Sequence, residues 1–262
     1  PSIDTFLDAH KDDNHVVASG KLGIASAILE AESNSKLYAD YRQGDRPDMA
    51  RAEGTWLPAV ASRMVEGVGK GDLHALFNNV SFITFNYDRC IELFLYHAIQ
   101  DYYGITGEQS SELMRSLEIR HPYGVVGRLP WQTGGGDPVP FGAELEGRSL
   151  LKVSERIKTF TERVDEGDQL ESMKSLVQKA QTIVFLGFSF QAQNMELLAV
   201  RNKGSTGRVF STAFGFSQSD CAVISADIRR ALMRHDGDVS IELRNSLKCF
   251  DLFNEYSKSI TQ

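Results

Sequence analysis

The sequence predicts an α/β fold in which a parallel sheet is covered by helices on both faces. Short apolar segments rich in β-forming residues recur along the chain, and segments with helical periodicity separate them. The strand-like segments are also continuously apolar rather than alternating. This pattern is typical of strands that are buried on both faces of a parallel sheet.

The first third of the chain is expected to be mainly helical. Helical spacing of apolar residues predicts helices over 2–10, 16–33, 55–68 and 72–77. We expect one domain over 1–262, with this helical segment at 1–78 and a parallel-sheet core at 79–262. Because the chain begins with Pro1 rather than Met, we also expect a fragment or processed product that is truncated at its N-terminus.

From residue 79 onward, strands and helices are expected to alternate. The predicted strands are 80–85, 117–124, 182–187, 208–214 and 239–242. The predicted helices are 89–103, 150–165, 168–179, 193–200, 217–235 and 245–257. We expect strands 80–85, 182–187 and 208–214 to lie parallel and adjacent in one sheet. Prolines and glycines concentrate at 127–142, which predicts a long loop that serves as a lid or a mobile crossing.

Composition and cysteine usage limit the possible partners. The net charge of −7 argues against a dedicated nucleic-acid surface. Cys90, Cys221 and Cys249 are widely separated and form no CxxC pair, so a structural zinc site and a disulfide framework are not expected. No apolar run approaches the ~20 residues that cross a bilayer. We therefore expect a cytoplasmic protein without a metal, a membrane anchor or a direct nucleic-acid partner.

Small and polar residues follow several predicted strands, and ligands bind at these carboxyl ends in open parallel sheets. Each motif also has a purely structural explanation, such as a turn that caps the next helix or a histidine with a packing role. Found together on successive strand ends, they predict one shared ligand site. The residues concerned are Asn86, Tyr87, Asp88, His121, Tyr123, Gly124, Gly187, Phe188, Ser189, Thr212, Gly215 and Ser217.

Three segments in chain order resemble the motifs of sirtuin-like domains. They are ITFNYDRCIE, RHPYG and IVFLGFSFQAQN, and they follow the family pattern of strand–T-x-N-Y-D, strand–H-x-x-G and strand–G-x-S. The likeness is strongest to the bacterial sirtuin-like group of anti-phage defence. It extends more weakly to SIDTFL, KLGIASAILEAE and STAFGFSQSD, and so spans most of the chain.

The resemblance implies a Rossmann-like domain that binds NAD and cleaves its nicotinamide–ribose bond. Carried over to this chain, Asn86 would place the attacking water, Asp88 would support the loop or the ribose, and His121 would be the general base. Cofactor-binding positions implied in the same way are Gly187, Phe188, Ser189 and Thr212.

Two departures from the family pattern leave the function open. The family begins with a strand and a Gly-rich turn that cradles pyrophosphate, but no such segment precedes SIDTFL, so the first βα unit is expected to be missing. The four-cysteine zinc module of protein deacetylases is also absent from the sequence. The intact protein is therefore expected to be an NAD glycohydrolase of bacterial antiviral defence, and this fragment, which lacks the phosphate-cradling turn, is expected to show little or no activity. Alternatively, it is a non-catalytic module that senses NAD or an ADP-ribose-type ligand. A homo-oligomer, or a fused or associated defence partner, is expected for both.

Overall fold

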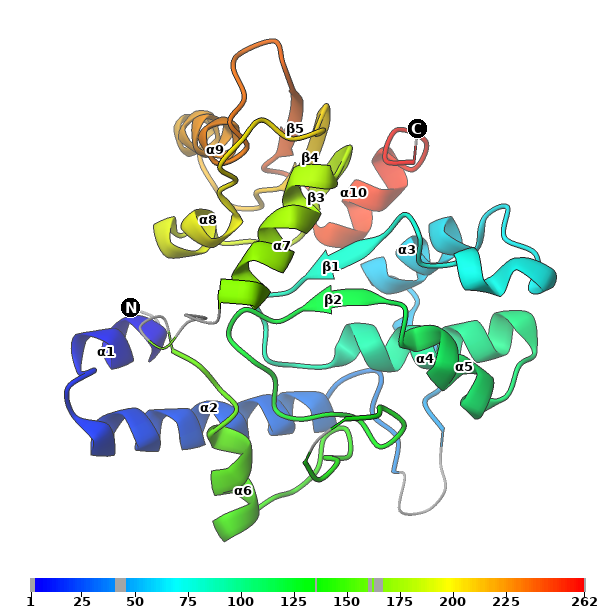
Figure 1. The fold of residues 1–262 in the computed structure, drawn as a ribbon, viewed down its shortest axis with the longest axis vertical. Coiled ribbons are helices and arrows are strands. Elements are labelled where there is room, and N and C mark those ends of the chain that lie inside the picture. Colours follow the sequence, from blue (N-terminus) through cyan, green and yellow to red (C-terminus); the bar gives the residue numbers. More distant parts are fainter. Residues whose placement is uncertain (1–2, 41–45, 135, 160–161, 163–166, 262) are drawn as a thin grey trace. The chain divides into compact units, whose positions relative to one another are not determined.

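The computed structural model describes residues 3–40, 46–134, 136–159, 162 and 167–261 (Figure 1). The chain forms two compact units, each made of two chain segments. Unit 1 comprises 1–53 and 64–165, and unit 2 comprises 54–63 and 166–262. Both units combine parallel strands with helices, so the predicted α/β class is confirmed.

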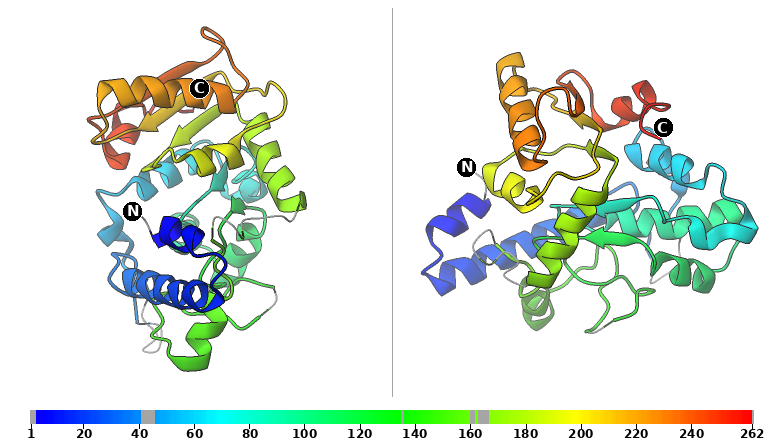
Figure 2. Two further views of the ribbon diagram at one scale, coloured as in Figure 1. Left: turned by 90° about the vertical axis from the view of Figure 1, so that its left-hand side faces the viewer. Right: turned by 45° about the horizontal axis from the view of Figure 1, so that its top comes forward.

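Unit 1 begins with helices α1 (Ile3–Ala9) and α2 (Asn14–Ser33), of which α1 folds back on α2 (Figure 2). Asp13 sets the start of α2, because its carboxylate accepts hydrogen bonds from backbone N–H groups of the first turn. Helix α6 (Gly147–Ser154) packs on the same helix. The apolar faces of these helices form a buried core with Leu7, Ile24, Ala25, Leu29 and Val153, which Ile157 joins from the segment after α6.

The rest of unit 1 surrounds a two-stranded sheet. Its remaining elements are η2 (Met49–Ala52), η3 (Lys70–Ala75), β1 (Ser81–Ile83), α4 (Cys90–Tyr103), α5 (Gly107–Met114) and β2 (Glu118–Arg120). Strands β1 and β2 pair in parallel, with Phe82 opposite Ile119. Helix α5 is an element that the sequence reasoning missed, although Thr106 and Gln109 form a capping box at its start.

Unit 2 contains a three-stranded parallel sheet in the order β3-β4-β5. Figure 1 shows α8 and α9 on one side of this sheet and α10 on the other. In chain order its elements are most of α3 (Trp56–Val65), then α7 (Gly167–Lys179), β3 (Thr182–Phe185), α8 (Ala192–Leu198), β4 (Arg208–Thr212), α9 (Gln218–Ala231), β5 (Ser240–Arg244) and α10 (Cys249–Glu255).

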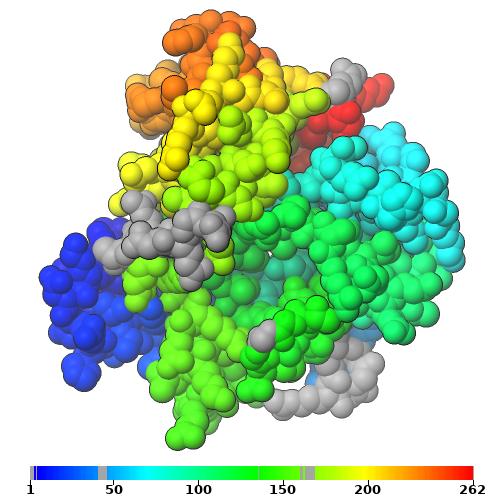
Figure 3. All heavy atoms as spheres, viewed as in Figure 1, coloured from blue at the N-terminus to red at the C-terminus, as the bar shows by residue number. Residues whose placement is uncertain are grey.

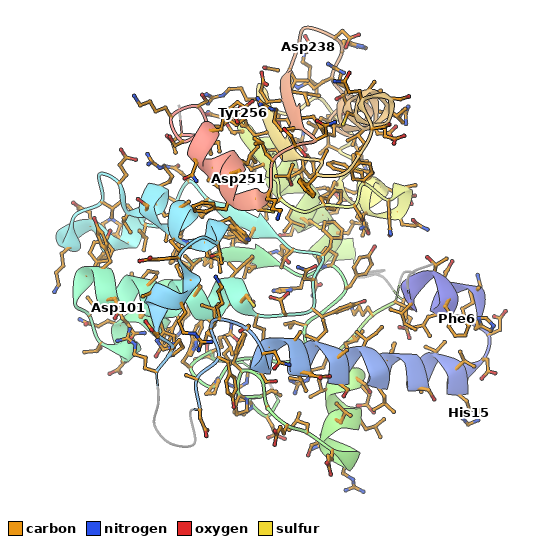
Figure 4. The ribbon with its side chains drawn as sticks, turned by 180° about the vertical axis from the view of Figure 1, so that it is seen from behind. Phe6, His15, Asp101, Asp238, Asp251 and Tyr256 are labelled. Carbon is orange, nitrogen blue, oxygen red and sulfur yellow. The ribbon has the colours of Figure 1, made fainter. Side chains whose placement is uncertain are left out.

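The core of unit 2 joins the sheet to its helices. Val209 of β4, Ile228 of α9 and Leu252 of α10 are fully buried. Tyr256, labelled in Figure 4, follows α10 and packs its ring 5.0 Å from that of Phe210. Helices on both faces of parallel, apolar strands therefore form as the sequence predicted.

The prediction that strands 80–85, 182–187 and 208–214 lie parallel and adjacent in one sheet is confirmed for 182–187 and 208–214 and wrong for 80–85. Within the described residues, β1 pairs with β2, whereas β3 and β4 pair with each other and β4 with β5. An apolar strand pattern indicates burial, but it carries no information about which other strand supplies the hydrogen bonds. Pairing is decided by long-range packing, which the local pattern does not encode.

Both ends of the loop over 127–142 belong to the core of unit 1, whereas most of the described residues between them are exposed. Leu129, Val139 and Phe141 are buried, and the backbone N–H of Val139 donates to the carbonyl of Arg128. Figure 3 shows green atoms of the segment between α5 and α6 at the surface of this unit. The prolines and glycines make the loop irregular, and its buried apolar residues anchor its two ends to the core.

Among the described helices, none is both long and apolar enough to cross a membrane. Helix α2 has 20 residues, but it carries Lys21, Glu30 and Glu32. Cys90, Cys221 and Cys249 have free thiols.

Candidate functional site

Strands β1 and β2 bring Asn86 and His121 together. The strands are parallel neighbours, and the backbone N–H of Thr84 extends the pairing by donating to the carbonyl of Arg120 at 2.9 Å. The loops that follow the strands therefore start at the same edge. His121 Nδ1 lies 3.1 Å from the backbone carbonyl oxygen of Asn86. The strand-end reasoning thus places these two residues in contact, through the Asn86 backbone rather than its side chain.

Both ring nitrogens of His121 have partners. Its Nε2 lies 2.9 Å from Oε1 of Glu92 in α4, and the two side chains are only 10% and 6% exposed. A carbonyl oxygen only accepts, so Nδ1 carries a hydrogen. A proton also lies between Nε2 and Glu92, on one partner or the other. In this arrangement no lone pair of the ring is available to take a proton from another molecule.

The surroundings of His121 favour the protonated ring. Burial alone would lower its pKa, but the hydrogen bond and the charge of Glu92 raise it. The Asn86 carbonyl and the charge of Asp88 act in the same direction, and the pKa of His121 ends above its ordinary value. The shift favours the imidazolium form, which must lose a proton before it can act as a base.

The side chain of Asp88 has a structural role at the start of α4. Its Oδ1 accepts a hydrogen bond of 3.0 Å from the backbone N–H of Cys90, at the start of α4. Burial, and next the charge of Asp88, raise the pKa of the Cys90 thiol. The thiol stays uncharged, so Cys90 is a packing residue rather than a nucleophile.

A buried ion pair fixes the loop that carries Asn86 and Asp88, and the sequence reasoning did not find it. Arg89 and Glu32 of α2 are 0% and 1% exposed. The guanidinium binds the carboxylate through two contacts, Nε–Oε1 of 3.0 Å and Nη2–Oε2 of 2.5 Å. The Arg89 backbone N–H also donates to Oε1 at 3.1 Å.

The same guanidinium holds the loop over 127–142. Its Nη1 donates to the carbonyl of Val139 at 2.5 Å, and its Nη2 donates to that of Pro140 at 3.2 Å. Oε2 of Glu32 accepts the backbone N–H of Gly142 at 3.0 Å. One ion pair therefore joins α2, the start of α4 and this loop, so that the candidate site rests on a fixed support.

In unit 2, the predicted cofactor-binding residues Gly187 and Thr212 meet at the ends of β3 and β4. The backbone N–H of Gly187 donates to Oγ1 of Thr212 at 2.9 Å, and Oγ1 donates to the carbonyl of Phe185 at 3.5 Å. Thr212 is buried, whereas Gly187 is exposed. The threonine hydroxyl therefore shapes the turn, and Gly187 presents backbone to the surface.

Phe188 and Ser189 complete the turn after β3. The Phe188 ring lies 5.3 Å from that of Phe185 and 5.1 Å from that of Phe190. Ser189 is exposed, and its hydroxyl makes no hydrogen bond with the described part of the chain. The catalytic candidates thus lie in unit 1 and the binding candidates in unit 2, and each group is assembled within its own unit.

A surface cleft of about 490 Å³ in unit 1 contains none of the predicted site residues. It is lined by Tyr96 of α4, by Arg115 and the residues of α5, and by Trp131. The rings of Tyr96 and Trp131 stack with centroids 4.3 Å apart. The sequence gives no sign of this cleft, since Trp131 lies in a segment without periodicity.

Comparison of the chain with protein-family models, with curated proteins and with solved structures gave no match. Within the ranges that the structure describes, no three His, Cys, Asp or Glu side chains gather as metal ligands would. The roles of Asn86, Asp88 and His121 therefore stay predictions that rest on the motifs and on the geometry above.

Two glycines of the predicted motifs should differ sharply in their tolerance of alanine. A Cβ on Gly124, where φ is +80°, would overlap the backbone carbonyl oxygen of Arg156. A Cβ on Gly187, where φ is +59°, would meet only the Cys249 sulfur at 3.7 Å. We expect Gly124→Ala to lower the free energy of unfolding by about 2–4 kcal/mol, and Gly187→Ala by about 1 kcal/mol.

Urea unfolding followed by circular dichroism measures both values. Equal losses in the two variants would contradict the close backbone approach at Gly124. Because Gly187→Ala leaves the fold intact on this reasoning, it also serves as a probe of ligand binding at the turn after β3.

Proposed function

We propose that this protein binds NAD and hydrolyses its nicotinamide–ribose bond. The observation that carries the proposal is the contact between His121 and the Asn86 loop at the ends of two adjacent parallel strands. Ligands of parallel sheets bind at such strand ends. The sequence motifs around these residues occur in the order typical of sirtuin-like domains, whose NAD chemistry supplies the substrate class.

The residue types suit this reaction. The leaving nicotinamide departs as a neutral base, so the reaction needs no general acid at the leaving group. The sugar becomes positively charged in the transition state, and the negative charge of Asp88 near His121 would stabilise that charge. This differs from ordinary glycosidases, in which one carboxylic acid protonates the leaving group.

The side chain of Asn86 is proposed to orient both the ribose and the attacking water, because an amide offers a donor and an acceptor. His121 is proposed to accept the proton of that water once its own extra proton has left. In unit 2, Gly187 and Ser189 are proposed to contact the phosphate–ribose part of the nucleotide, because both are exposed at the turn after β3. We further propose a cytoplasmic role in defence, with a second copy or a defence protein as partner.

The hydrogen bonding of His121 favours a second function, in which the ligand is bound but not cleaved. Because both ring nitrogens already have partners, the ring offers no free base in this arrangement. A module that binds NAD or an ADP-ribose-type ligand without turnover would need none. The two functions share the ligand class and differ in whether a bond is broken.

One pair of measurements separates the two functions. The full-length protein is incubated with NAD, nicotinamide release is followed by chromatography, and NAD affinity is measured by calorimetry. Nicotinamide release supports the hydrolase, and tight binding without release supports the sensing module. If the protein neither binds NAD nor releases nicotinamide, both proposed functions are excluded.

A further inference from the structure

Glu92 is held in place by one strong partner. Its Oε1 contacts Nε2 of His121 at 2.9 Å, and the side chain is 6% exposed. Its other oxygen, Oε2, is buried and has no hydrogen-bond partner within the described part of the chain. A buried carboxylate is costly unless it is paired and hydrogen-bonded. The contact with His121 is therefore the interaction that holds this buried side chain.

The proton on the His121 ring is in turn stabilised by the acidic groups around it. Glu92 faces His121 from α4, and Asp88 faces it from the loop after β1. The cations that follow Asp88 and precede His121 in the chain are engaged elsewhere, because Arg89 pairs with Glu32 of α2 and Arg120 of β2 pairs with Glu118. The ring is thus next to two carboxylates, and Glu92 is the one in direct contact.

We propose that Glu92 is a positioning residue that fixes the ring of His121 and controls which protonation state the ring has when a nucleotide arrives. This inference rests on the proposed function for its catalytic meaning. In the structure, Nδ1 of His121 contacts the Asn86 carbonyl and Nε2 contacts Glu92. Release of the shared proton removes the attraction between Nε2 and the carboxylate, which frees the ring to turn its lone pair toward water.

Glu92→Gln tests the control of protonation directly, since it removes the charge of the side chain and keeps its size and hydrogen-bonding capacity. We expect the pKa of His121, followed by nuclear magnetic resonance of the histidine ring, to fall below its wild-type value. The measurement needs no substrate. Glu112→Gln is the matched control, because Glu112 is a carboxylate of the same unit with a side chain 69% exposed, and it should leave the titration unchanged.

His97 provides an internal reference in the same spectra. It lies on α4 like Glu92, but its Nδ1 accepts a hydrogen bond of 3.1 Å from Arg46. Burial, and next the charge of Arg46, lower the pKa of His97 to about 4. Arg46 is held in turn by Asp101, labelled in Figure 4, at 2.7 Å. The titration of His97 should be the same in wild type and in Glu92→Gln.

The kinetic counterpart is the pH dependence of nicotinamide release. If His121 must lose a proton to act, the midpoint of the acidic limb moves to lower pH in Glu92→Gln, and KM stays unchanged. On that limb turnover then rises about tenfold for each pH unit by which the midpoint moves. A merely structural role of Glu92 would lower turnover at every pH without moving the midpoint.

The outcomes distinguish this inference from the proposed function. An unchanged His121 titration in Glu92→Gln overturns the positioning role, whatever the activity. A lowered pKa together with an absence of nicotinamide release from all variants leaves the control of His121 by Glu92 intact and removes the hydrolase. A lowered pKa with a shifted pH–rate limb supports both.

Discussion

Replacing Arg89 by methionine is expected to lower the free energy of unfolding by about 3–5 kcal/mol, because it leaves a buried carboxylate without its cation. Glu32 is 1% exposed and cannot recover the lost interaction from water. The carbonyl groups of Val139 and Pro140 also lose their donor. We expect Glu32→Gln to have a similar effect, since it leaves the guanidinium buried and unpaired.

The double replacement Glu32→Leu with Arg89→Met separates the charge from the hydrogen bonds. Removing both charges avoids an isolated buried ion, and hydrophobic replacement of such pairs is often tolerated. Here the carbonyls of Val139 and Pro140 and the N–H of Gly142 would still lack partners. We therefore expect the double variant to be more stable than either single variant and less stable than the wild type.

Arg115→Met is the matched control in the same unit. Arg115 pairs with Glu112 at 2.5 Å, as closely as Arg89 pairs with Glu32, but these side chains are 51% and 69% exposed. Exposed pairs contribute little, so the expected loss is below about 1 kcal/mol. Urea unfolding of the variants gives the comparison. If Arg89→Met costs no more than Arg115→Met, the ion pair does not support the loop.

Most strands and helices could be predicted from the sequence because their signals are local, although α5 was missed and the helix predicted over 150–165 instead spans Gly147–Ser154. Apolar β-forming runs such as TIVF, and the periodicity of α4 and α9, mark elements without knowledge of their neighbours. The partner of β1 could not be predicted in this way, because strand pairing joins residues far apart in the chain. The anchoring of the loop over 127–142 could not be predicted for the same reason, since Arg89 and Glu32 hold it from other segments.

The candidate site was predictable in part. The contact between His121 and the Asn86 loop follows from the rule that the ends of parallel strands meet at one edge. Glu92 and Glu32 were missed, although each left a signal. Glu92 is a lone acid in the apolar run CIELFL, and Glu32 continues the buried face that includes Ala25 and Leu29. A charge on an apolar helix face indicates a buried partner, because burial without one is too costly.

Replacing His121 by glutamine is expected to reduce the proposed nicotinamide release by about 10²–10⁴-fold, the usual contribution of a positioned acid or base. Glutamine is preferred to alanine here, because its amide can still donate to Glu92 and so avoids an unpaired buried carboxylate. It cannot take a proton from water near neutral pH. NAD affinity should persist, since the side chain is 10% exposed and offers little binding surface.

Asn86→Ala tests the second proposed catalytic group without disturbing the first. His121 is held by the backbone carbonyl of Asn86, which alanine keeps, so only the exposed amide is lost. We expect turnover to fall while the His121 titration stays as in wild type. Asn78→Ala, which removes another exposed amide of unit 1, is the control and should leave turnover unchanged. Ser189→Ala should instead weaken binding, because it is proposed to contact the bound nucleotide in both ground and transition states.

Nicotinamide release measured beside calorimetric affinity for these variants decides between the proposed roles. Full turnover in His121→Gln would exclude His121 as the base and would redirect attention to the carboxylates of Glu92 and Asp88. Loss of affinity in His121→Gln at unchanged stability would mean that the ring contacts the ligand itself. Retained affinity with turnover lost in both His121→Gln and Asn86→Ala is the expected result, since only groups that act in the bond-breaking step change the rate without changing the binding.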